Sequence, residues 1–517
     1  MSEPVPAAEV PPPAYVVKAP SGARQAALER RSGRFVLTLR GGIEADLGPA
    51  PDGRLRAERG RYLARFTTPS GKRRVHRLTG RRLTVAGVEV LATEDGVAWR
   101  TRGADAVVRA PRDTRAWLQR YTGAYEEPYR GGRLAGRARG RYAFPLLLRD
   151  RGRYTLLTEA GVARAAVSHT RLAADGLHVQ IARGESAPRR TPWRIAVTGG
   201  LDRVVESDLP LALGRQSKVR DTSWIEPGVA AWSWLSDHSS PERLETQKEY
   251  VDLAVAQGWE YVTVDEGWRP GFIRELIAYA RARGVKVILW FDKDDVTARV
   301  LDQVERWGAA GVKADFFYSD SEEQIRAMDD IARQAAARRL VVAFHGCTVP
   351  RGLQRTWPNV LTVEAVRGAE YGDTTARDEV NLAFTRNPVG GMDFTPAGTG
   401  ARELAQAVVF ESGLQHLGGA AGIYADADRI LRELPAAWDD TRLLTGAPDR
   451  HAVIGRRDGR RWFVGGLTAG PKRTLEVPLP PGRWKVHLVG ENGSRDFEAT
   501  GTISTRGDFA AILTRDG

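Results

Sequence analysis

Three short apolar runs with polar ends decide the fold of this chain: GVKADFF (311–317), LVVAFHG (340–346) and VLTVEAVRGAE (360–370). Each apolar run has the length of a buried strand, and each delivers charged residues or a histidine at its C-terminal end. In a parallel barrel the C-terminal ends of the strands meet at one face, where the reacting groups lie. The three runs therefore predict a parallel barrel with a polar mouth.

The same alternation extends on both sides of these runs, from about residue 216 to 440. Apolar strands are followed by stretches with helical spacing, which is typical of repeated βα units and a parallel sheet. Eight strand positions can be counted, which favours a (β/α)8 TIM barrel over a doubly wound sheet. Besides the three runs above, the strand positions are 230–235, 261–268, 285–292, 389–396 and a last short strand near 414–419.

The chain on either side of the barrel has a different pattern. Short runs with period-two alternation, broken by glycine, fill residues 16–215 and predict an N-terminal β-sandwich. Alternation returns in residues 441–517, which predicts a small C-terminal antiparallel β-domain. Residues 1–15 are rich in proline and alanine and are expected to form a flexible N-terminus. The catalytic barrel is then residues 216–440.

The composition limits the possible partners and compartment. The net charge is +13, but the arginines are scattered, so we expect no nucleic-acid partner. No apolar run reaches the ~18 residues of a membrane span, and no basic stretch followed by an apolar core marks a signal peptide. We expect a cytoplasmic protein that does not enter the membrane, or a periplasmic or secreted one where a leader has been removed. Cys347 is the only cysteine, so an intrachain disulfide is excluded.

The predicted barrel mouth is rich in acids. Cleavage of an acetal needs two carboxyl groups, one to protonate the leaving oxygen and one to attack the anomeric carbon or activate water. An acidic mouth therefore suits glycoside hydrolysis better than acyl transfer, and motifs such as G-x-S-x-G and H-E-x-x-H are absent from the sequence. The candidate residues at the strand ends are Asp265, Asp292, Asp315, His345, Glu364, Glu370 and Asp393.

Each candidate also has a structural alternative. Asp265 and Asp292 could equally cap the segments that follow them. Glu364 and Glu370 flank Arg367, and the three could form an ion-pair network at the rim. Asp315 is the hardest to explain structurally, because an acid on a buried strand is costly unless it is paired or used.

These motifs resemble glycoside hydrolase family 97. The resemblance rests on HGCTVPRGLQRTWPNVLTVEAVRGAE (345–370), with GVKADFF before it and FTRNPVGGMDFTP (384–396) after it. WIEPGVAAWSWL (224–235) and TEAGV (158–162) also look like segments of that family. The resemblance implies an N-terminal β-sandwich, a central barrel and a small C-terminal β-domain.

The resemblance also implies a mechanism. Inverting members of the family carry a glutamate directly after the histidine of the H-G-like motif, and that position here is Gly346. Retaining members carry an aspartate nucleophile in a K-x-D-F-F motif, which matches Asp315. The resemblance thus implies Asp315 as nucleophile and Glu370 as general acid/base, about 5–5.5 Å apart. Among substrate contacts it implies Lys313, His345, Asp265 and Arg367.

The family resemblance further implies a calcium ion bound through Glu159, Glu364 and Glu370. The function it implies is retaining hydrolysis of terminal α-galactosides, with an oligosaccharide or glycoside as substrate. The alternatives are α-glucosidase or β-L-arabinopyranosidase activity on the same scaffold. A catalytically dead barrel that binds glycans is the non-enzymatic alternative.

Overall fold

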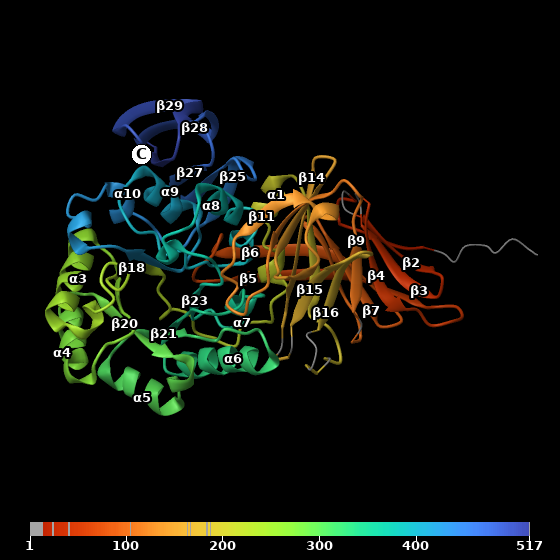
Figure 1. Cartoon of the computed structure of the whole chain (residues 1–517), viewed down its shortest axis with the longest axis horizontal. Helices are drawn as coiled ribbons and strands as arrows, with labels where there is room; N and C mark the ends of the chain where they lie inside the picture. The colour runs from red at the N-terminus through yellow and green to blue at the C-terminus, as the bar shows by residue number, and fades with distance from the viewer. Residues whose placement is uncertain are drawn as a thin grey trace, which may run out of the picture.

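The computed structural model describes residues 14–515, except 23–24, 40–41, 104, 163, 166, 182–184 and 187. Three sheet systems follow one another along the chain (Figure 1). The predicted flexible N-terminus lies outside the described residues up to position 13, and strand β1 (Tyr15–Lys18) follows directly. The described residues include no helix long and apolar enough to cross a membrane.

The N-terminal part consists of two antiparallel sheets, as the alternating pattern predicts. The strand orders are β1-β2-β3-β4-β9-β16-β15-β12 and β11-β10-β13-β14-β17-β8-β7-β6-β5. Their inner faces share an apolar core that includes Trp99, Leu118 and Leu146. The bounds are β2 Gln25–Arg31, β3 Arg34–Leu39, β4 Ile43–Pro49, β5 Ala57–Thr67, β6 Val75–Val85, β7 Val88–Thr93, β8 Gly96–Arg100, β9 Ala106–Arg109, β10 Arg115–Gln119, β11 Tyr129–Arg133, β12 Gly140–Tyr142, β13 Leu146–Asp150, β14 Arg153–Ala160, β15 Ser168–Ala173, β16 Gly176–Ile181 and β17 Trp193–Gly199.

Two short helices, α1 (Leu201–Glu206) and α2 (Leu209–Ala212), connect the sandwich to a parallel sheet of seven strands. Its order is β23-β22-β21-β20-β19-β18-β24, and all neighbours are parallel. The strands are β18 Gly228–Trp232, β19 Tyr261–Val264, β20 Lys286–Asp292, β21 Gly311–Asp315, β22 Val341–Phe344, β23 Val360–Val363 and β24 Leu414–Gly418. The predicted barrel is thus confirmed.

The eighth predicted strand position differs from a regular strand. The segment around 389–397 forms only two parallel bridges, from Val363 to Met392 and from Ala397 to Gly418. These bridges join the two edges of the sheet and nearly close the ring. Prolines at 388 and 396 lack the amide hydrogen that a continuous strand pairing requires, which explains the irregular form.

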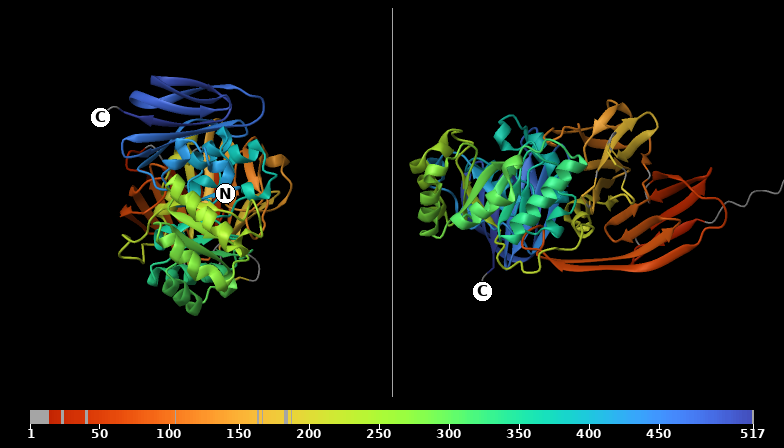
Figure 2. Two further views of the ribbon diagram at one scale, coloured as in Figure 1. Left: turned by 90° about the vertical axis from the view of Figure 1, so that its left-hand side faces the viewer. Right: turned by 90° about the horizontal axis from the view of Figure 1, so that it is seen from below.

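Helices cover the outside of the barrel (Figure 2). Their ends follow ordinary capping chemistry: Thr297 accepts a hydrogen bond from Val300 N at the start of α5, and Gly308 adopts φ +82° at its end. The helices are α3 Leu244–Gln257, α4 Pro270–Arg281, α5 Ala298–Trp307, α6 Glu322–Ala337, α7 Leu353–Thr356, α8 Ala376–Leu382, α9 Ala401–Val409 and α10 Arg429–Arg432.

The C-terminal sheet packs against helix α9 of the barrel (Figure 1). Its order is β25-β26-β27-β30-β28-β29, with bounds Asp440–Ala447, His451–Asp458, Arg461–Thr468, Phe509–Thr514, Thr474–Gly490 and Gly493–Arg506 respectively. The buried Arg456 guanidinium donates to the carbonyls of Val408 and Val409, both at 2.7 Å, at the C-terminal end of α9. This contact satisfies carbonyls that a helix end leaves unpaired.

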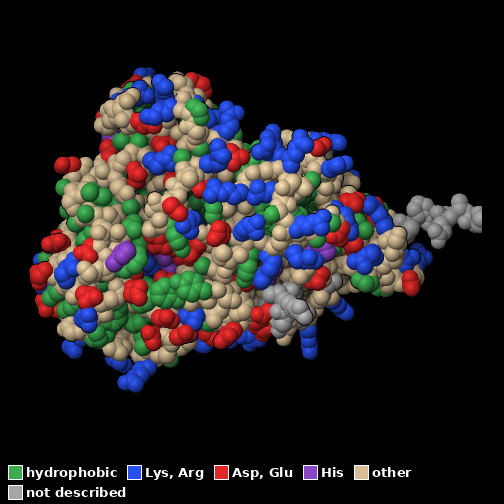
Figure 3. Space-filling view, viewed as in Figure 1, with side chains coloured by type: hydrophobic (Ala, Val, Ile, Leu, Met, Phe, Trp, Pro, Cys, Tyr) green, Lys and Arg blue, Asp and Glu red, His purple; other side chains and the backbone are tan. Residues whose placement is uncertain are grey.

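Basic and acidic side chains are interspersed on the face shown in Figure 3. Lysine and arginine spread over the sandwich as well as the barrel and the C-terminal sheet, in agreement with the scattered arginines of the sequence.

Candidate active site

Side chains from neighbouring strand ends meet in one pocket of about 280 Å³ at the C-terminal face of the barrel. This volume is near the lower end of the ~300–1,000 Å³ typical of small-molecule sites, which suits one sugar ring. The structure thus brings together Asp265, Lys313, Asp315, His345, Glu364 and Glu370. The other lining residues are Glu126, Trp234, His238, Glu266, Trp290, Phe316, Tyr318, Gly346 and Tyr371.

Asp315 ends strand β21, and its carboxylate is held by two donors. The indole Nε1 of Trp290 donates to Oδ2 at 3.1 Å, and the amide of Phe316 donates to Oδ1 at 2.6 Å. Gly346 lies opposite with φ +50°, a backbone conformation that favours glycine. A Cβ added to Gly346 would lie only 2.8 Å from Asp315 Oδ1. The space that the Asp315 carboxylate occupies therefore depends on a glycine at position 346.

Lys313 and Asp265 form a buried ion pair beneath the pocket, with Nζ and Oδ2 2.7 Å apart. Trp232 Nε1 donates to the same Asp265 oxygen at 2.7 Å. Burial lowers the pKa of Lys313, but the carboxylates of Asp265 and Asp315 outweigh it and raise the pKa overall. Burial likewise acts against the charge on Asp265, and Lys313 reverses the effect and lowers its pKa. The two groups hold each other in their charged forms.

His345 is fixed by a second buried carboxylate. Its Nε2 lies 2.8 Å from Asp393 Oδ2, which is also 2.6 Å from His416 Nδ1. Burial and the charge of Lys313 lower the pKa of His345, but the hydrogen bond to Asp393 and the charges of Asp393 and Asp315 together outweigh them and raise the pKa overall. Asp393, a candidate from the sequence, thus orients two histidines and does not line the pocket.

Three glutamates face one another on the other side of the pocket. The carboxyl group of Glu364 lies beside those of Glu126 and Glu370, and its Oε2 accepts from Gly346 N at 2.7 Å. Burial and the neighbouring carboxyl groups raise the pKa of all three. Buried carboxyl groups this close repel one another when all are ionised, so this cluster either holds protons or binds a cation.

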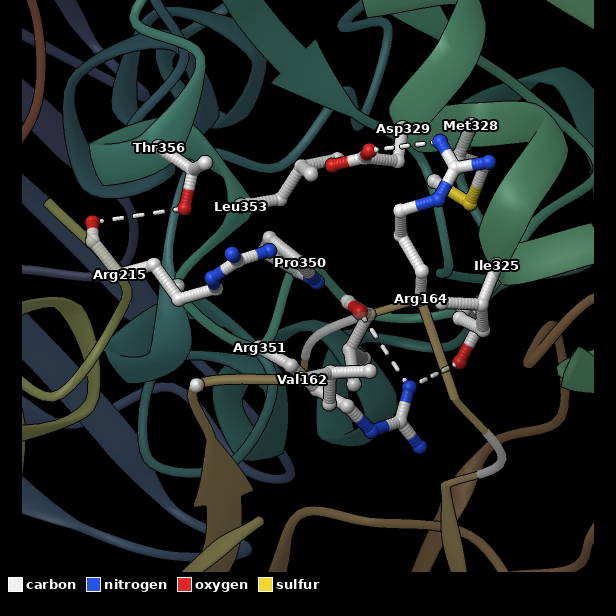
Figure 4. A pocket seen from close by; sticks show the side chains of 14 residues that line it. Val162, Arg164, Arg215, Ile325, Met328, Asp329, Pro350, Arg351, Leu353 and Thr356 are labelled. Carbon is white, nitrogen blue, oxygen red and sulfur yellow. Dashed lines mark hydrogen bonds and ion pairs between the residues drawn. The ribbon is translucent and has the colours of Figure 1, made fainter. Parts of the chain in front are cut away.

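Two residues that the family resemblance implied at the site, Glu159 and Arg367, have other contacts. Glu159 is buried on β14 and accepts from Arg351 Nε at 2.8 Å and from Ser168 N at 3.0 Å. Arg351 lines a separate small cavity between the sandwich and α6, shown in Figure 4, and so Glu159 does not reach the pocket. Arg367 forms a two-pronged ion pair with Asp373, at 2.8 and 2.7 Å, and does not line the pocket.

Asp292 caps the segment that follows it, which is the structural alternative that the sequence allowed. Its side chain accepts from Asp294 N at 2.9 Å and caps a short 3-10 helix, Lys293–Asp295. Asp265, by contrast, serves the pocket through Lys313, although it also accepts from Glu266 N at 2.9 Å.

The residue that sequence reasoning missed is Glu126. It lies in a loop between β10 and β11 of the sandwich and reaches the barrel mouth, where Tyr371 donates a hydrogen bond to it. The acidic pair within TGAYEEPY (122–129) was the available indication. It could not be connected to strand ends about 140 to 240 residues later without the structure.

Comparison with known proteins identifies the family. The model of glycoside hydrolase 97 matches residues 224–366, and that of the glycosyl-hydrolase 97 C-terminal region, described as serving oligomerisation, matches residues 437–495. A "Probable retaining alpha-galactosidase" of Streptomyces bingchenggensis is 37% identical, covering 89% of this chain and 84% of that protein. The chain belongs to glycoside hydrolase family 97. The expected family and enzyme class are thus confirmed: this is a glycoside hydrolase that acts on carbohydrate.

Further relatives agree with this assignment. The "Retaining alpha-galactosidase" of Bacteroides thetaiotaomicron is 32% identical over 56% of this chain and 52% of that protein. Among solved structures, a beta-arabinopyranosidase superposes with a TM-score of 0.86 at 22% identity, covering 96% of this chain and all of the other. A family 97 enzyme of Pseudoalteromonas sp., solved with acarbose, also gives 0.86 at 20% identity, covering 97% and 100%. These structural matches establish the fold.

Proposed function

We propose that this family 97 enzyme is a retaining α-galactosidase with Asp315 as nucleophile and Glu370 as general acid/base. The observation that carries the proposal is the contact between Asp315 and Gly346. A side chain at position 346 would meet the Asp315 carboxylate, so an inverting base at 346 and a nucleophile at 315 exclude each other in this backbone. The relatives named as retaining α-galactosidases support the same branch and substrate.

In the first step, the Asp315 carboxylate attacks the anomeric carbon while the proton of Glu370 passes to the glycosidic oxygen. The glycosidic bond breaks and the aglycone leaves as an alcohol. Glu370 suits the role of acid because burial and Glu364 raise its pKa, so that it holds a proton when the substrate arrives. Trp290 and the Phe316 amide fix the Asp315 carboxylate for the attack.

In the second step, Glu370 has lost its proton and takes one from a water molecule. The water oxygen bonds to the anomeric carbon, the bond to Asp315 breaks, and the free enzyme returns with Glu370 protonated. Two displacements restore the α configuration of the sugar. The ionised pair of Lys313 and Asp265 supplies a charged donor and a carboxylate to the pocket that receives the sugar. Nδ1 of His345 faces Glu364 at the same pocket.

We further propose that the glutamate cluster holds calcium. Glu126 and Glu364 offer carboxylate oxygens, which calcium prefers, and Glu370 offers the oxygen that does not carry its proton; the burial of these groups and the repulsion between the carboxylates would be offset by a cation. When bound, calcium would supply positive charge that stabilises negative charge developing at the mouth. Glu126 takes the place that Glu159 had in the sequence-based prediction, since Glu159 is paired with Arg351.

The test is proton NMR of the fresh product from an aryl α-galactoside, with Asp315→Asn as control. We expect α-galactose first, and none from the variant. Initial β-galactose would mean inversion and would remove Asp315 from the role of nucleophile. Turnover of an α-glucoside or a β-L-arabinopyranoside in place of the α-galactoside would keep the mechanism and replace the substrate.

A further inference from the structure

Two exposed aromatic rings stand at the mouth of the same pocket. Of the large hydrophobic side chains that are exposed in the described residues, Tyr318 (57% exposed) and Tyr371 (39%) are the aromatic ones, and both line this pocket. The other exposed large hydrophobic side chains are aliphatic. Exposed aromatic surface beside an active site is typical of ligand recognition, because a rigid ring offers a large contact area at low entropic cost.

Tyr318 is held in a strained backbone conformation. Its φ is +45°, and that of Phe316, two residues earlier, is +68°. Such conformations are unfavourable for residues other than glycine and persist where surrounding contacts enforce them. Here the Tyr318 amide donates to Gly346 O at 2.6 Å, and the Tyr318 ring stacks on Phe316 at 5.4 Å and 22°.

The sandwich also supports this loop. Gly123 approaches the carbonyl of Tyr318 so closely that an added Cβ would overlap it. Asp320, just beyond, accepts from Tyr121 OH at 2.7 Å. The loop that follows the nucleophile is thus fixed from both sides, and the fixed conformation keeps the Tyr318 ring in solvent. The strained backbone is maintained by contacts with Gly346, with Gly123 and, through Asp320, with Tyr121. Because these contacts leave the Tyr318 ring exposed, they indicate that the ring has a function.

Tyr371 is held just as firmly. The guanidinium of Arg367 covers one face of its ring at 4.0 Å, and Asp373 fixes that guanidinium through two hydrogen bonds. The Tyr371 hydroxyl donates to Glu126. The ring is therefore oriented at one face and at its tip while part of it stays exposed. Tyr371 directly follows Glu370, which places it beside the group that protonates the leaving oxygen.

We propose that Tyr318 and Tyr371 form an aglycone subsite that stacks against a ring in the leaving group. The inference rests on the proposed function, because it takes Glu370 as the acid that marks the leaving-group side. It narrows the substrate class to α-galactosides whose aglycone presents a ring face, either a second sugar residue or an aromatic group. Binding energy from this remote contact would lower the barrier of bond cleavage.

The test compares substrates with and without an aglycone ring. In α-galactosyl fluoride the leaving group is a single atom, whereas an α-galactosyl disaccharide and p-nitrophenyl α-galactoside each carry a ring. We expect Tyr318→Ala and Tyr371→Ala to lower kcat/KM on one or both ring-bearing substrates about tenfold or more beyond any loss on the fluoride. Tyr371→Phe keeps the ring and removes the hydroxyl that contacts Glu126. The ratio of kcat/KM on the ring-bearing substrates to kcat/KM on the fluoride should therefore stay at the wild-type value in this variant.

Tyr279 provides a matched control on the outside of the barrel. Its ring is covered by Arg283 at 3.4 Å and its hydroxyl donates to Asp252 at 2.9 Å, an environment like that of Tyr371. Tyr279 does not line the pocket. Tyr279→Ala should leave the ratio between substrates unchanged. Equal losses on the fluoride and the ring-bearing substrates, or no loss, would overturn the subsite alone. If the wild type cleaves none of the three substrates, the proposed function fails and the subsite falls with it.

Discussion

Replacing Gly346 by alanine tests the arrangement of the proposed nucleophile, Asp315, directly. The added Cβ would lie 2.8 Å from Asp315 Oδ1 and 3.0 Å from Phe316 N, whereas ordinary contact begins at 3.4 Å. The carboxylate would therefore have to move by about 0.6 Å, the difference between 3.4 and 2.8 Å. A misplacement of ~1 Å costs ~10²-fold in rate, so we expect Gly346→Ala to lose about 10- to 100-fold in kcat/KM.

The same substitution has a cost to stability that must be separated from this loss. Alanine at φ +50° is disfavoured by ~1–2 kcal/mol in the left-handed region. Gly258, at the C-cap of α3, provides the control, because its φ is +74° and an added Cβ would meet nothing within 4 Å. Gly258→Ala should show a similar loss of unfolding free energy with unchanged activity.

Two measurements on both variants are sufficient: kcat/KM on α-galactosyl fluoride and the midpoint of thermal unfolding. The fluoride is chosen because it reports on the attack by Asp315 with little demand on the acid. Wild-type kcat/KM in Gly346→Ala would refute the steric argument, as the carboxylate would then tolerate the methyl group. A matching loss of activity in Gly258→Ala would show that the effect comes from general destabilisation.

Three further predictions follow from the same site. Glu370→Gln should lower kcat/KM on a disaccharide by ~10²–10⁴-fold and much less on the fluoride, which needs less protonation; equal losses would contradict the acid role. EDTA should lower activity and calcium should restore it, with Glu126→Gln requiring more calcium than the wild type; full activity in chelator would exclude a catalytic metal. Burial raises the pKa of Asp320, but His169, Arg351 and the hydrogen bond from Tyr125 together outweigh it and lower the pKa to about 2. A carboxyl group whose pKa is lowered by folding stabilises the protein at pH values above its unfolded-state pKa, and this stabilisation is lost as the pH falls. Asp320→Asn should therefore lower the free energy of unfolding by ~2.5 kcal/mol at pH 7 and by about half of that near pH 3. The same loss at both pH values would contradict this prediction.

The barrel part of the site was predictable from the sequence for a physical reason. Parallel strands place their C-terminal ends on one face, so residues at those ends must converge wherever they lie in the sequence. Asp265, Asp315, His345 and Glu364 all end buried strands or directly follow them, and they meet there with Lys313 from within β21. The register of a short apolar strand thus fixes the position of the polar residue that ends it.

The contribution of the sandwich was not predictable in the same way. Glu126 lies in a loop of an antiparallel sheet, and nothing in its local pattern indicates which loop faces the barrel. Glu159 resembled a family position but lies on a buried strand, where a carboxylate needs a cationic partner, and Arg351 provides it. The irregular eighth strand position had a local explanation in its prolines, whereas the choice between Glu126 and Glu159 depends on how two domains pack.

That packing makes the N-terminal sandwich part of the catalytic apparatus. One loop of the sandwich contributes Glu126 to the pocket, and it places Gly123 against the backbone of the nucleophile loop. The same loop carries Tyr125, whose hydroxyl bonds to both Asp320 and Arg351, and so it links the segment after Asp315 to the segment after Gly346. These two segments must stay in register for the carboxylate to fit over the glycine. The sandwich therefore helps to fix the distance between Asp315 and Gly346 on which the proposed mechanism depends, although it supplies neither of the two proposed reacting carboxyl groups.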